Sequence, residues 1–268
     1  MSPPSPIIRL EIPADDPRQA HLVIDNPGAR NGLTAPACAD MAAELERVGA
    51  DPAIRAVVVR GAGDHFCSGA DLRSAGPAMG DDDKVRAYLR DGFHKLVKVL
   101  WDCPKPTLAV IRGACVGFGF DLALAADLRV AASDATFGQV FSKIGLVPDG
   151  GSSFSLTRLV GLGKAMELML LAERFDGVEA HRIGLLNRVV APEDLDALAA
   201  DWARRLASGP PIAFRLGKHN LRAGAGGGTV HDALQREADA QLVCLRSRDA
   251  LIGVQAFFLK QEAKFEGR

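Results

Sequence analysis

The sequence predicts an α/β protein, because short segments rich in β-branched residues alternate with segments of helical periodicity. The strand-like segments are residues 21–25, 56–60, 107–112, 128–132 and 187–190. From about residue 203 onward strand-like segments cease and the pattern becomes helical only. We therefore expect an α/β core over residues 1–202 and a helical region over residues 203–268.

The helical segments have identifiable ends and faces. Thr34 is a candidate N-cap for the first helix, and Asp176 and Thr229 are candidate N-caps for two later ones. Residues 84–101 carry apolar side chains at three- and four-residue spacing, which predicts one amphipathic helix. These assignments complete the alternation of strands and helices.

A weak internal repeat suggests how the strands are arranged. Residues 58–62 recur in similar form as residues 110–114. Each copy is followed, after a glycine-containing loop, by Gly-x-Asp-Leu, at residues 69–72 and 119–122. Two strand–loop–helix units of similar design are expected to stack as turns of one spiral.

The composition excludes several classes of protein. The 268 residues include 32 Lys and Arg against 33 Asp and Glu, and a net charge of −1 offers no basic surface for nucleic acid. The sequence contains no run of about 18 apolar residues, and so it predicts no membrane span. The five cysteines form no C-x-x-C pair, which disfavours a disulfide framework or zinc site and suits a reducing compartment. We predict a cytoplasmic protein with no nucleic-acid partner, no membrane partner and no metal.

Common catalytic motifs are missing. The segment Gly117-Phe118-Gly119 resembles the start of a dinucleotide fingerprint, but Leu122 stands where its third glycine belongs. The sequence has no phosphate-binding P-loop, no G-x-S-x-G elbow and no H-E-x-x-H zinc motif. Nucleotide, serine-hydrolase and metalloprotease chemistry are therefore unsupported.

Two glycine-rich loops follow strands and are the strongest functional signal in the residues themselves. They span residues 61–71 and 113–121. Glycine lets backbone N–H groups approach a ligand closely, and a helix N-terminus adds free donors. Two such loops side by side could hold one oxygen as an oxyanion hole. Two tight strand-to-helix turns without catalytic purpose are the alternative.

The order and spacing of several motifs resemble the crotonase superfamily, the enoyl-CoA hydratases and isomerases, over roughly residues 20–265. The matching motifs are residues 30–33, 66–72, 117–121, 137–138, 145–151 and 256–258. The resemblance implies a crotonase-type spiral of ββα units with a helical C-terminal trimerisation region. It also implies a homotrimer or dimer of trimers acting on an acyl-CoA thioester. Coenzyme A would enter as part of that substrate, with no separate cofactor.

The same resemblance implies an oxyanion hole for the thioester oxygen. By position its two N–H donors belong to Ala70 and Phe118. The family usually has glycine where Phe118 stands. Only the amide is needed, and the phenyl ring is expected to narrow the acyl pocket.

Departures from the family's hydratase pattern decide which reaction is expected. Hydratases carry two glutamates, and here those positions hold Asp121 and Phe141. Asp149 instead resembles the catalytic aspartate of family isomerases, where one base moves a proton between two carbons. We expect Leu146, Val147 and Phe141 to desolvate Asp149 partly and raise its pKa. The leading hypothesis is therefore an enoyl-CoA isomerase that uses Asp149.

Several alternatives remain open at this point. A hydratase could use Asp121, and a relative that binds acyl-CoA or RNA without catalysis could share the fold, as could a spiral-fold serine protease. Asp149 could be only the N-cap of the helix that follows it, and Asp121 could be only a cap of its own helix.

The resemblance assigns two groups of residues to coenzyme A. The first lines the nucleotide and pantetheine path, and the second is a C-terminal tail that can cover the phosphates, often across a subunit boundary. The first group is Arg30, Ala70, Asp71 and Leu72, and the second is Phe257, Lys260 and Lys264. The alternative for the two lysines is that they are ordinary solvated helix charges.

Overall fold

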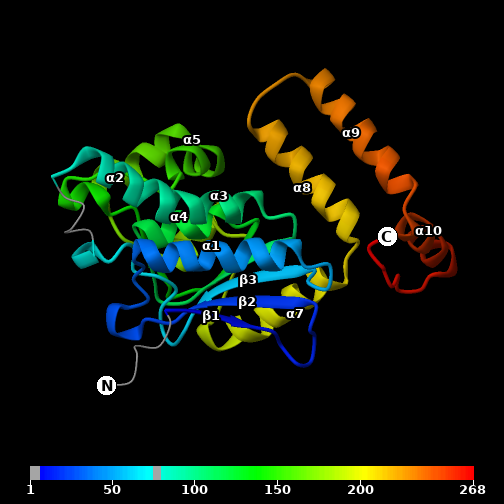
Figure 1. The fold of residues 1–268 in the computed structure, drawn as a ribbon, viewed down its shortest axis with the longest axis horizontal. Coiled ribbons are helices and arrows are strands. Elements are labelled where there is room, and N and C mark those ends of the chain that lie inside the picture. The colour runs from blue at the N-terminus through cyan, green and yellow to red at the C-terminus, as the bar shows by residue number, and fades with distance from the viewer. Residues whose placement is uncertain (1–6, 75–79) are drawn as a thin grey trace.

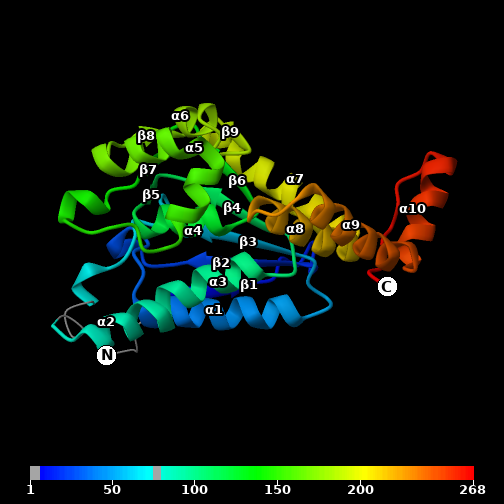
Figure 2. The same ribbon diagram turned by 90° about the horizontal axis from the view of Figure 1, so that it is seen from above.

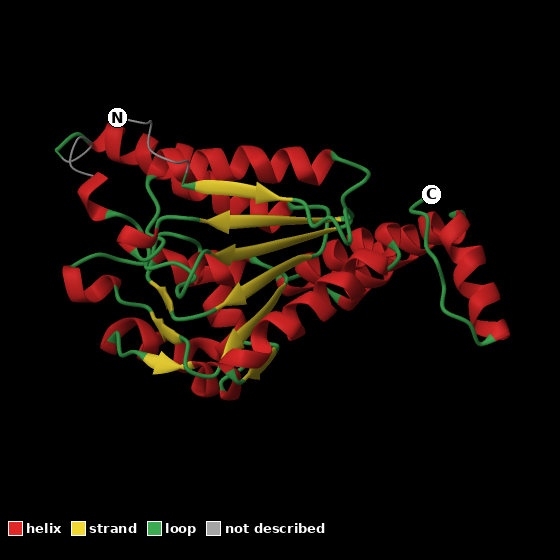
Figure 3. Ribbon diagram, turned by 90° about the horizontal axis from the view of Figure 1, so that it is seen from below, coloured by secondary structure: helices red, strands yellow, loops and turns green. Residues whose placement is uncertain are grey.

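The computed structural model describes residues 7–74 and 80–268. Its main element is a six-stranded sheet with strand order β1-β2-β3-β4-β6-β9 (Figures 1 and 3). β1 pairs with β2 in antiparallel fashion and all other neighbours are parallel. The strands are β1 (Ile8–Glu11), β2 (Gln19–Ile24), β3 (Ala56–Gly61), β4 (Thr107–Ile111), β6 (Leu128–Ala132) and β9 (Arg188–Val190). All five predicted strands are thereby confirmed, with small shifts at their ends.

Helices cover both faces of this sheet. α1 (Ala35–Ala50) lies on one face and α7 (Leu195–Ser208) on the other (Figure 1). Between the two layers Val57, Val58 and Val59 of β3 are all buried, as expected for a strand covered on both sides. The remaining body helices are α2 (Asp82–Tyr88), α3 (Lys95–Asp102), α4 (Phe118–Ala125), α5 (Ser152–Leu171) and α6 (Gly177–Arg182).

A second, three-stranded sheet shows that successive turns of a spiral are stacked. It contains β5 (Ala114–Val116), β7 (Thr136–Gly138) and β8 (Phe175–Asp176). Cys67 of the first turn bridges to Cys115, which in turn pairs with Phe137. The predicted spiral is confirmed, but its register differs. Val58 lies opposite Leu108 rather than Val110, and this two-residue offset keeps each side chain on the same face.

The predicted helix over residues 84–101 is interrupted by one wider turn. A π-helical turn, Leu89–His94, joins α2 to α3. A Cβ placed on Gly92 within this turn would lie 2.7 Å from Cβ of Ala35. Only glycine allows so close an approach to α1. Apolar periodicity alone did not reveal this turn, because it depends on contact with another helix.

The predicted N-caps are all present. The side chains of Thr34 and Asp176 accept hydrogen bonds from the third backbone N–H beyond them. Thr229 does the same and forms a reciprocal capping box with Asp232.

The C-terminal helices extend away from the body. α8 (Pro211–Ala225) and α9 (Val230–Leu245) form a hairpin, and α10 (Arg248–Leu259) lies at its far end (Figures 1 and 2). Asp127 anchors α8 to the body through Lys218 at 2.6 Å and Arg222 at 2.7 Å. The expected division at residue 202 falls inside α7 and stays a prediction. Across the described ranges, none of the helices is long and apolar enough to cross a membrane.

Candidate active site

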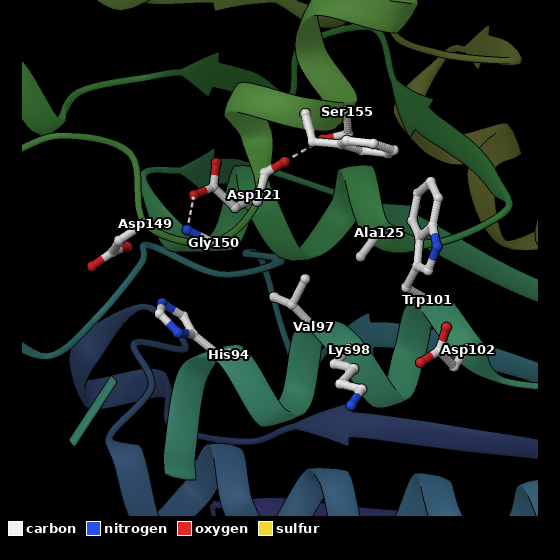
Figure 4. A pocket seen from close by; sticks show the side chains of 12 residues that line it. His94, Val97, Lys98, Trp101, Asp102, Asp121, Ala125, Asp149, Gly150 and Ser155 are labelled. Carbon is white, nitrogen blue, oxygen red and sulfur yellow. Dashed lines mark hydrogen bonds between the residues drawn. The ribbon is translucent and has the colours of Figure 1, made fainter. Parts of the chain in front are cut away.

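A cavity of about 430 Å³ lies between α3, α4 and the start of α5 (Figure 4). Carboxylates and a histidine line one part of it, and mainly apolar or aromatic side chains line the other. Its wall is formed by His94, Val97, Lys98, Trp101, Asp102, Asp121, Ala125, Asp149, Gly150, Gly151, Phe154 and Ser155. The cavity therefore brings both sequence-predicted carboxylates to one place.

The two glycine-rich loops meet as the sequence suggested. A Cβ placed on Gly69 would lie 3.4 Å from the amide nitrogen of Phe118, so the loop before Ala70 touches the start of α4. Gly117 holds φ at 55°, a left-handed conformation that turns the chain into α4. Within the described part of the chain, the N–H groups of Ala70 and Phe118 donate to no other group. Two free donors on adjoining loops have the character of an oxyanion hole.

The Phe118 side chain points away from this site. Its ring is 1% exposed and packs edge-on against Phe93, with ring centroids 4.7 Å apart. The ring does not line the cavity. The expectation that it narrows the acyl pocket is therefore wrong, because α4 directs this side chain into the core.

Asp121 is a fully buried carboxylate on α4. Its Oδ1 accepts a hydrogen bond of 2.6 Å from Nε2 of Gln139, and its Oδ2 accepts one of 2.9 Å from the backbone N–H of Gly150. Burial raises the pKa of Asp121 to about 6, and these hydrogen bonds oppose the rise. The cap alternative is wrong, because both oxygens bind groups outside its own helix.

Asp149 lies in the loop before α5 and is half-buried. The N-cap position of α5 belongs to Gly151, in the left-handed region, and no side chain caps it. The N-cap alternative for Asp149 is therefore wrong. Burial raises the pKa of Asp149, and the nearby His94 acts in the opposite direction.

The expected rise in the pKa of Asp149 is confirmed. Leu146 and Val147 are 49% and 73% exposed, and neither they nor Phe141 line the cavity with Asp149. Figure 4 shows Asp149 across from His94, the last residue of the π-helical turn. The apolar environment is supplied by α3 and α5 across the cavity.

Sequence reasoning missed the residues that the π-helical turn and α3 contribute. His94, Val97 and Trp101 lie on one helical stripe, next to the core stripe that predicted the helix. This second stripe, which combines a histidine with apolar residues, was visible in the sequence and could have indicated that this face lines a site. Trp101 meets Phe154 of α5 edge-on at 5.5 Å and closes the apolar part of the cavity.

Phe141 stands at the second hydratase position. It is 8% exposed in a 3₁₀ turn, Phe141–Ile144, and packs in the core. It does not line the cavity.

The residues expected to contact coenzyme A fall into two separate places. Arg30 and Leu72 lie near Ala70, with Leu72 55% exposed, and Asp71 forms an ion pair with Arg73 at 2.9 Å. The tail residues Phe257, Lys260 and Lys264 are exposed on and after α10. Figures 1 and 2 show α10 far from α4 and α5, so one chain does not bring the two groups together.

Comparisons with known proteins identify the family of this chain. The sequence model of the enoyl-CoA hydratase/isomerase family matches residues 20–268. A probable enoyl-CoA hydratase of Rhodobacter capsulatus is 37% identical over 93% of this chain and 95% of its own length. A 1,2-epoxyphenylacetyl-CoA isomerase of Escherichia coli is 34% identical over 92% and 94%.

Solved structures show the same fold. An enoyl-CoA hydratase of Bacillus anthracis superposes with a TM-score of 0.91 at 29% identity, covering 98% of this chain and all of the other. The matches in sequence and structure both extend over nearly the whole chain. The protein belongs to the enoyl-CoA hydratase/isomerase family, with its crotonase fold.

Proposed function

We propose that this enzyme shifts a double bond in an enoyl-CoA thioester, with Asp149 as the acid and base. The observation that carries the proposal is the contrast in hydrogen bonding around the cavity. Both oxygens of Asp121 are engaged by the chain. Asp149 is half-buried and lines the cavity, and within residues 7–74 and 80–268 its carboxylate accepts no hydrogen bond from another residue, only its own backbone N–H acting on it. A single available carboxylate suits proton transfer between two carbons.

In this reaction the thioester oxygen accepts hydrogen bonds from the amides of Ala70 and Phe118. Asp149 removes a proton from C2 of a 3-enoyl thioester, and the electrons delocalise as a dienolate onto the thioester oxygen. The two amides stabilise that oxygen as its charge grows. Asp149 then returns the proton at C4, which leaves a 2-enoyl thioester and the enzyme unchanged. The raised pKa of Asp149 makes its carboxylate a stronger base.

The acyl group lies in the apolar part of the cavity, against Val97, Trp101 and Phe154. The coenzyme A portion extends past Arg30, Asp71 and Leu72, beside the proposed oxyanion hole. The phosphates are contacted by Phe257, Lys260 and Lys264 of a neighbouring subunit, because these residues lie too far from the cavity of their own chain.

A hydratase using Asp121 is the second candidate. Asp121 stands at the first hydratase position, its pKa of about 6 suits acid–base chemistry, and relatives include a probable hydratase. The occupied oxygens of Asp121 and the core position of Phe141 count against this candidate.

The experiment is an assay of 2-enoyl-, 3-enoyl- and aryl-CoA thioesters for both isomerisation and hydration. We expect isomerisation of a 3-enoyl thioester that falls sharply in Asp149→Asn. Hydration of 2-enoyl thioesters that persists in Asp149→Asn and disappears in Asp121→Asn would establish the hydratase instead.

We also propose that the protein assembles as a homotrimer or a dimer of trimers. The C-terminal helices expose a large apolar surface that a single chain leaves uncovered. It includes Val230, Leu234, Leu242, Leu245, Leu251, Val254, Phe257 and Phe258. Light scattering is expected to give three or six times the chain mass of 28.3 kDa. A monomer at micromolar concentration would contradict this assembly.

A further inference from the structure

The loop that carries Asp149 rests directly on Asp121. The backbone N–H of Gly150, the residue next to Asp149, donates to Oδ2 of Asp121 at 2.9 Å. A Cβ placed on Gly150 would lie 2.5 Å from Cβ of Asp121, so the two groups are in tight contact. Figure 4 shows this bond joining α4 to the loop, with the Asp149 side chain on the other side of the peptide.

A second contact holds the chain two residues further on, where α5 begins. Nε2 of Gln139 donates to Oδ1 of Asp121 at 2.6 Å and to Oγ of Ser152 at 2.8 Å. Asp121, Gln139 and Ser152 are each at most 1% exposed. The chain is therefore fixed at two points just after Asp149, Gly150 and Ser152, and both lead to the carboxylate of Asp121.

We infer that Asp121 is a positioning residue, which fixes the Asp149 carboxylate through the Gly150 peptide and does not exchange protons with the substrate. This inference rests on the proposed function of Asp149. Two consecutive glycines follow Asp149, and glycine restrains its backbone least. A charged acceptor makes a stronger bond to an amide than a neutral one. A carboxylate at position 121 thus supplies the restraint that the loop sequence lacks.

A double-mutant cycle separates positioning from proton transfer. The measurement is the rate of deuterium exchange from heavy water into a 3-enoyl-CoA. Asp121→Asn is expected to lower kcat by roughly ten- to a hundredfold with KM nearly unchanged, since a small displacement of a base is costly. In an Asp149→Asn background, Asp121→Asn is expected to have no further effect, because Asp121 acts only by positioning the Asp149 carboxylate, which is already absent.

The outcomes of the cycle are distinct. A further loss of exchange in the double variant would show that Asp121 transfers protons itself and would overturn the inference. A fully active Asp121→Asn enzyme beside an inactive Asp149→Asn enzyme would overturn the inference and leave the proposed function intact. Full exchange in Asp149→Asn would overturn both.

Gly150→Ala tests position while leaving both carboxylates in place. The new methyl group has no room beside Asp121 and must push the loop away from it. A fall in kcat similar to that of Asp121→Asn is expected, with the thioester still bound. Wild-type kcat in a folded Gly150→Ala enzyme would show that the position of this peptide does not matter, and would overturn the inference.

Asp127→Asn is the matched control. Asp127 is also a largely buried carboxylate that accepts a backbone N–H, from Thr107 at 2.8 Å, but it holds α8 rather than the Asp149 loop. This variant is expected to lower the melting temperature and leave exchange per folded molecule unchanged. If Asp127→Asn lowers exchange as much as Asp121→Asn, the effect is general loss of stability and the inference fails.

Discussion

Asp121 and Asp149 line the same cavity in opposite surroundings. Asp121 is 1% exposed and both of its oxygens accept hydrogen bonds from the chain, whereas Asp149 is half-buried and faces His94 across open space. A buried and fully hydrogen-bonded carboxylate can hold a loop in place. A partly desolvated carboxylate with free lone pairs can accept a proton. The sequence favoured Asp149 only through its resemblance to family isomerases and left Asp121 as the alternative.

After the loss of Asp149 itself, the largest effect is expected from Ala70→Pro. In the proposed mechanism Asp149 transfers the proton, and two amide donors stabilise the dienolate. The N–H of Ala70 makes no bond within the described chain, so proline removes a donor of the proposed oxyanion hole without removing a backbone hydrogen bond seen there. Turnover is expected to fall by roughly 10²–10³-fold. Calorimetry with a CoA thioester should show binding nearly intact, and unchanged turnover would remove Ala70 from the site.

The second effect is on stability and concerns Asp121. Its pKa is about 6 in the fold and 3.8 ordinarily, so between these values the folded state binds more protons than the unfolded state. Stability therefore falls as pH rises from about 4 to about 6. The difference corresponds to about 3 kcal/mol at 1.36 kcal/mol per pKa unit. The Asp121→Asn variant should lose this pH-dependent contribution to the free energy of unfolding.

Chemical denaturation of wild type and Asp121→Asn at several pH values measures that contribution. The free energy of unfolding of the variant, relative to that of wild type, is expected to increase as pH rises from about 4 to about 6. A difference between the two proteins that is independent of pH would mean that Asp121 titrates normally and is less buried than described.

A third effect concerns the apolar part of the cavity. Trp101 separates it from two neighbouring cavities of about 620 and 400 Å³, which Trp101 also lines. Trp101→Ala should open a path to them and shift the kcat/KM preference toward longer acyl chains by about tenfold. Trp202→Ala, at the other tryptophan, on α7, is the control and should leave the preference unchanged. An unchanged preference in Trp101→Ala would place the acyl group elsewhere.

The smallest effect is expected on the pH–rate profile, because His94 changes the pKa of only one of the two carboxyl groups. His94 favours the charged form of Asp149 and lowers the pKa of that carboxyl, but it does not act on Asp121. His94→Gln should therefore raise the pKa of Asp149 and move the ascending limb of the pH–rate profile to higher pH. His231→Gln, an exposed histidine on α9, is the control. A limb that moves to lower pH in His94→Gln would contradict this electrostatic assignment.

The sequence predicted features whose causes are local. Strands showed as β-branched segments, and Thr34 and Thr229 as caps three residues from their partners. The offset between β3 and β4 and the π-helical turn were not predictable in this way, because both depend on contacts between distant segments.

The candidate site divides along the same line. Motif order located Asp149 and the loops of Ala70 and Phe118. The role of Asp121 depends on Gly150, a partner far along the chain, and the place of His94 depends on how α3 crosses α5. Such contacts leave no periodic trace in one sequence, and so the cap alternatives stayed open until the structure placed both side chains.

The most direct test of the account compares Asp149→Asn with Asp121→Asn by deuterium exchange into a 3-enoyl-CoA, alongside thermal melting. Asparagine keeps size and hydrogen bonding but is not a useful base. We expect Asp149→Asn to lose roughly 10²–10⁴-fold in exchange with an almost unchanged melting temperature, since it caps no helix. Asp121→Asn should lose less. Full exchange in a well-folded Asp149→Asn protein, with exchange lost in Asp121→Asn, would contradict the account and reverse the two roles.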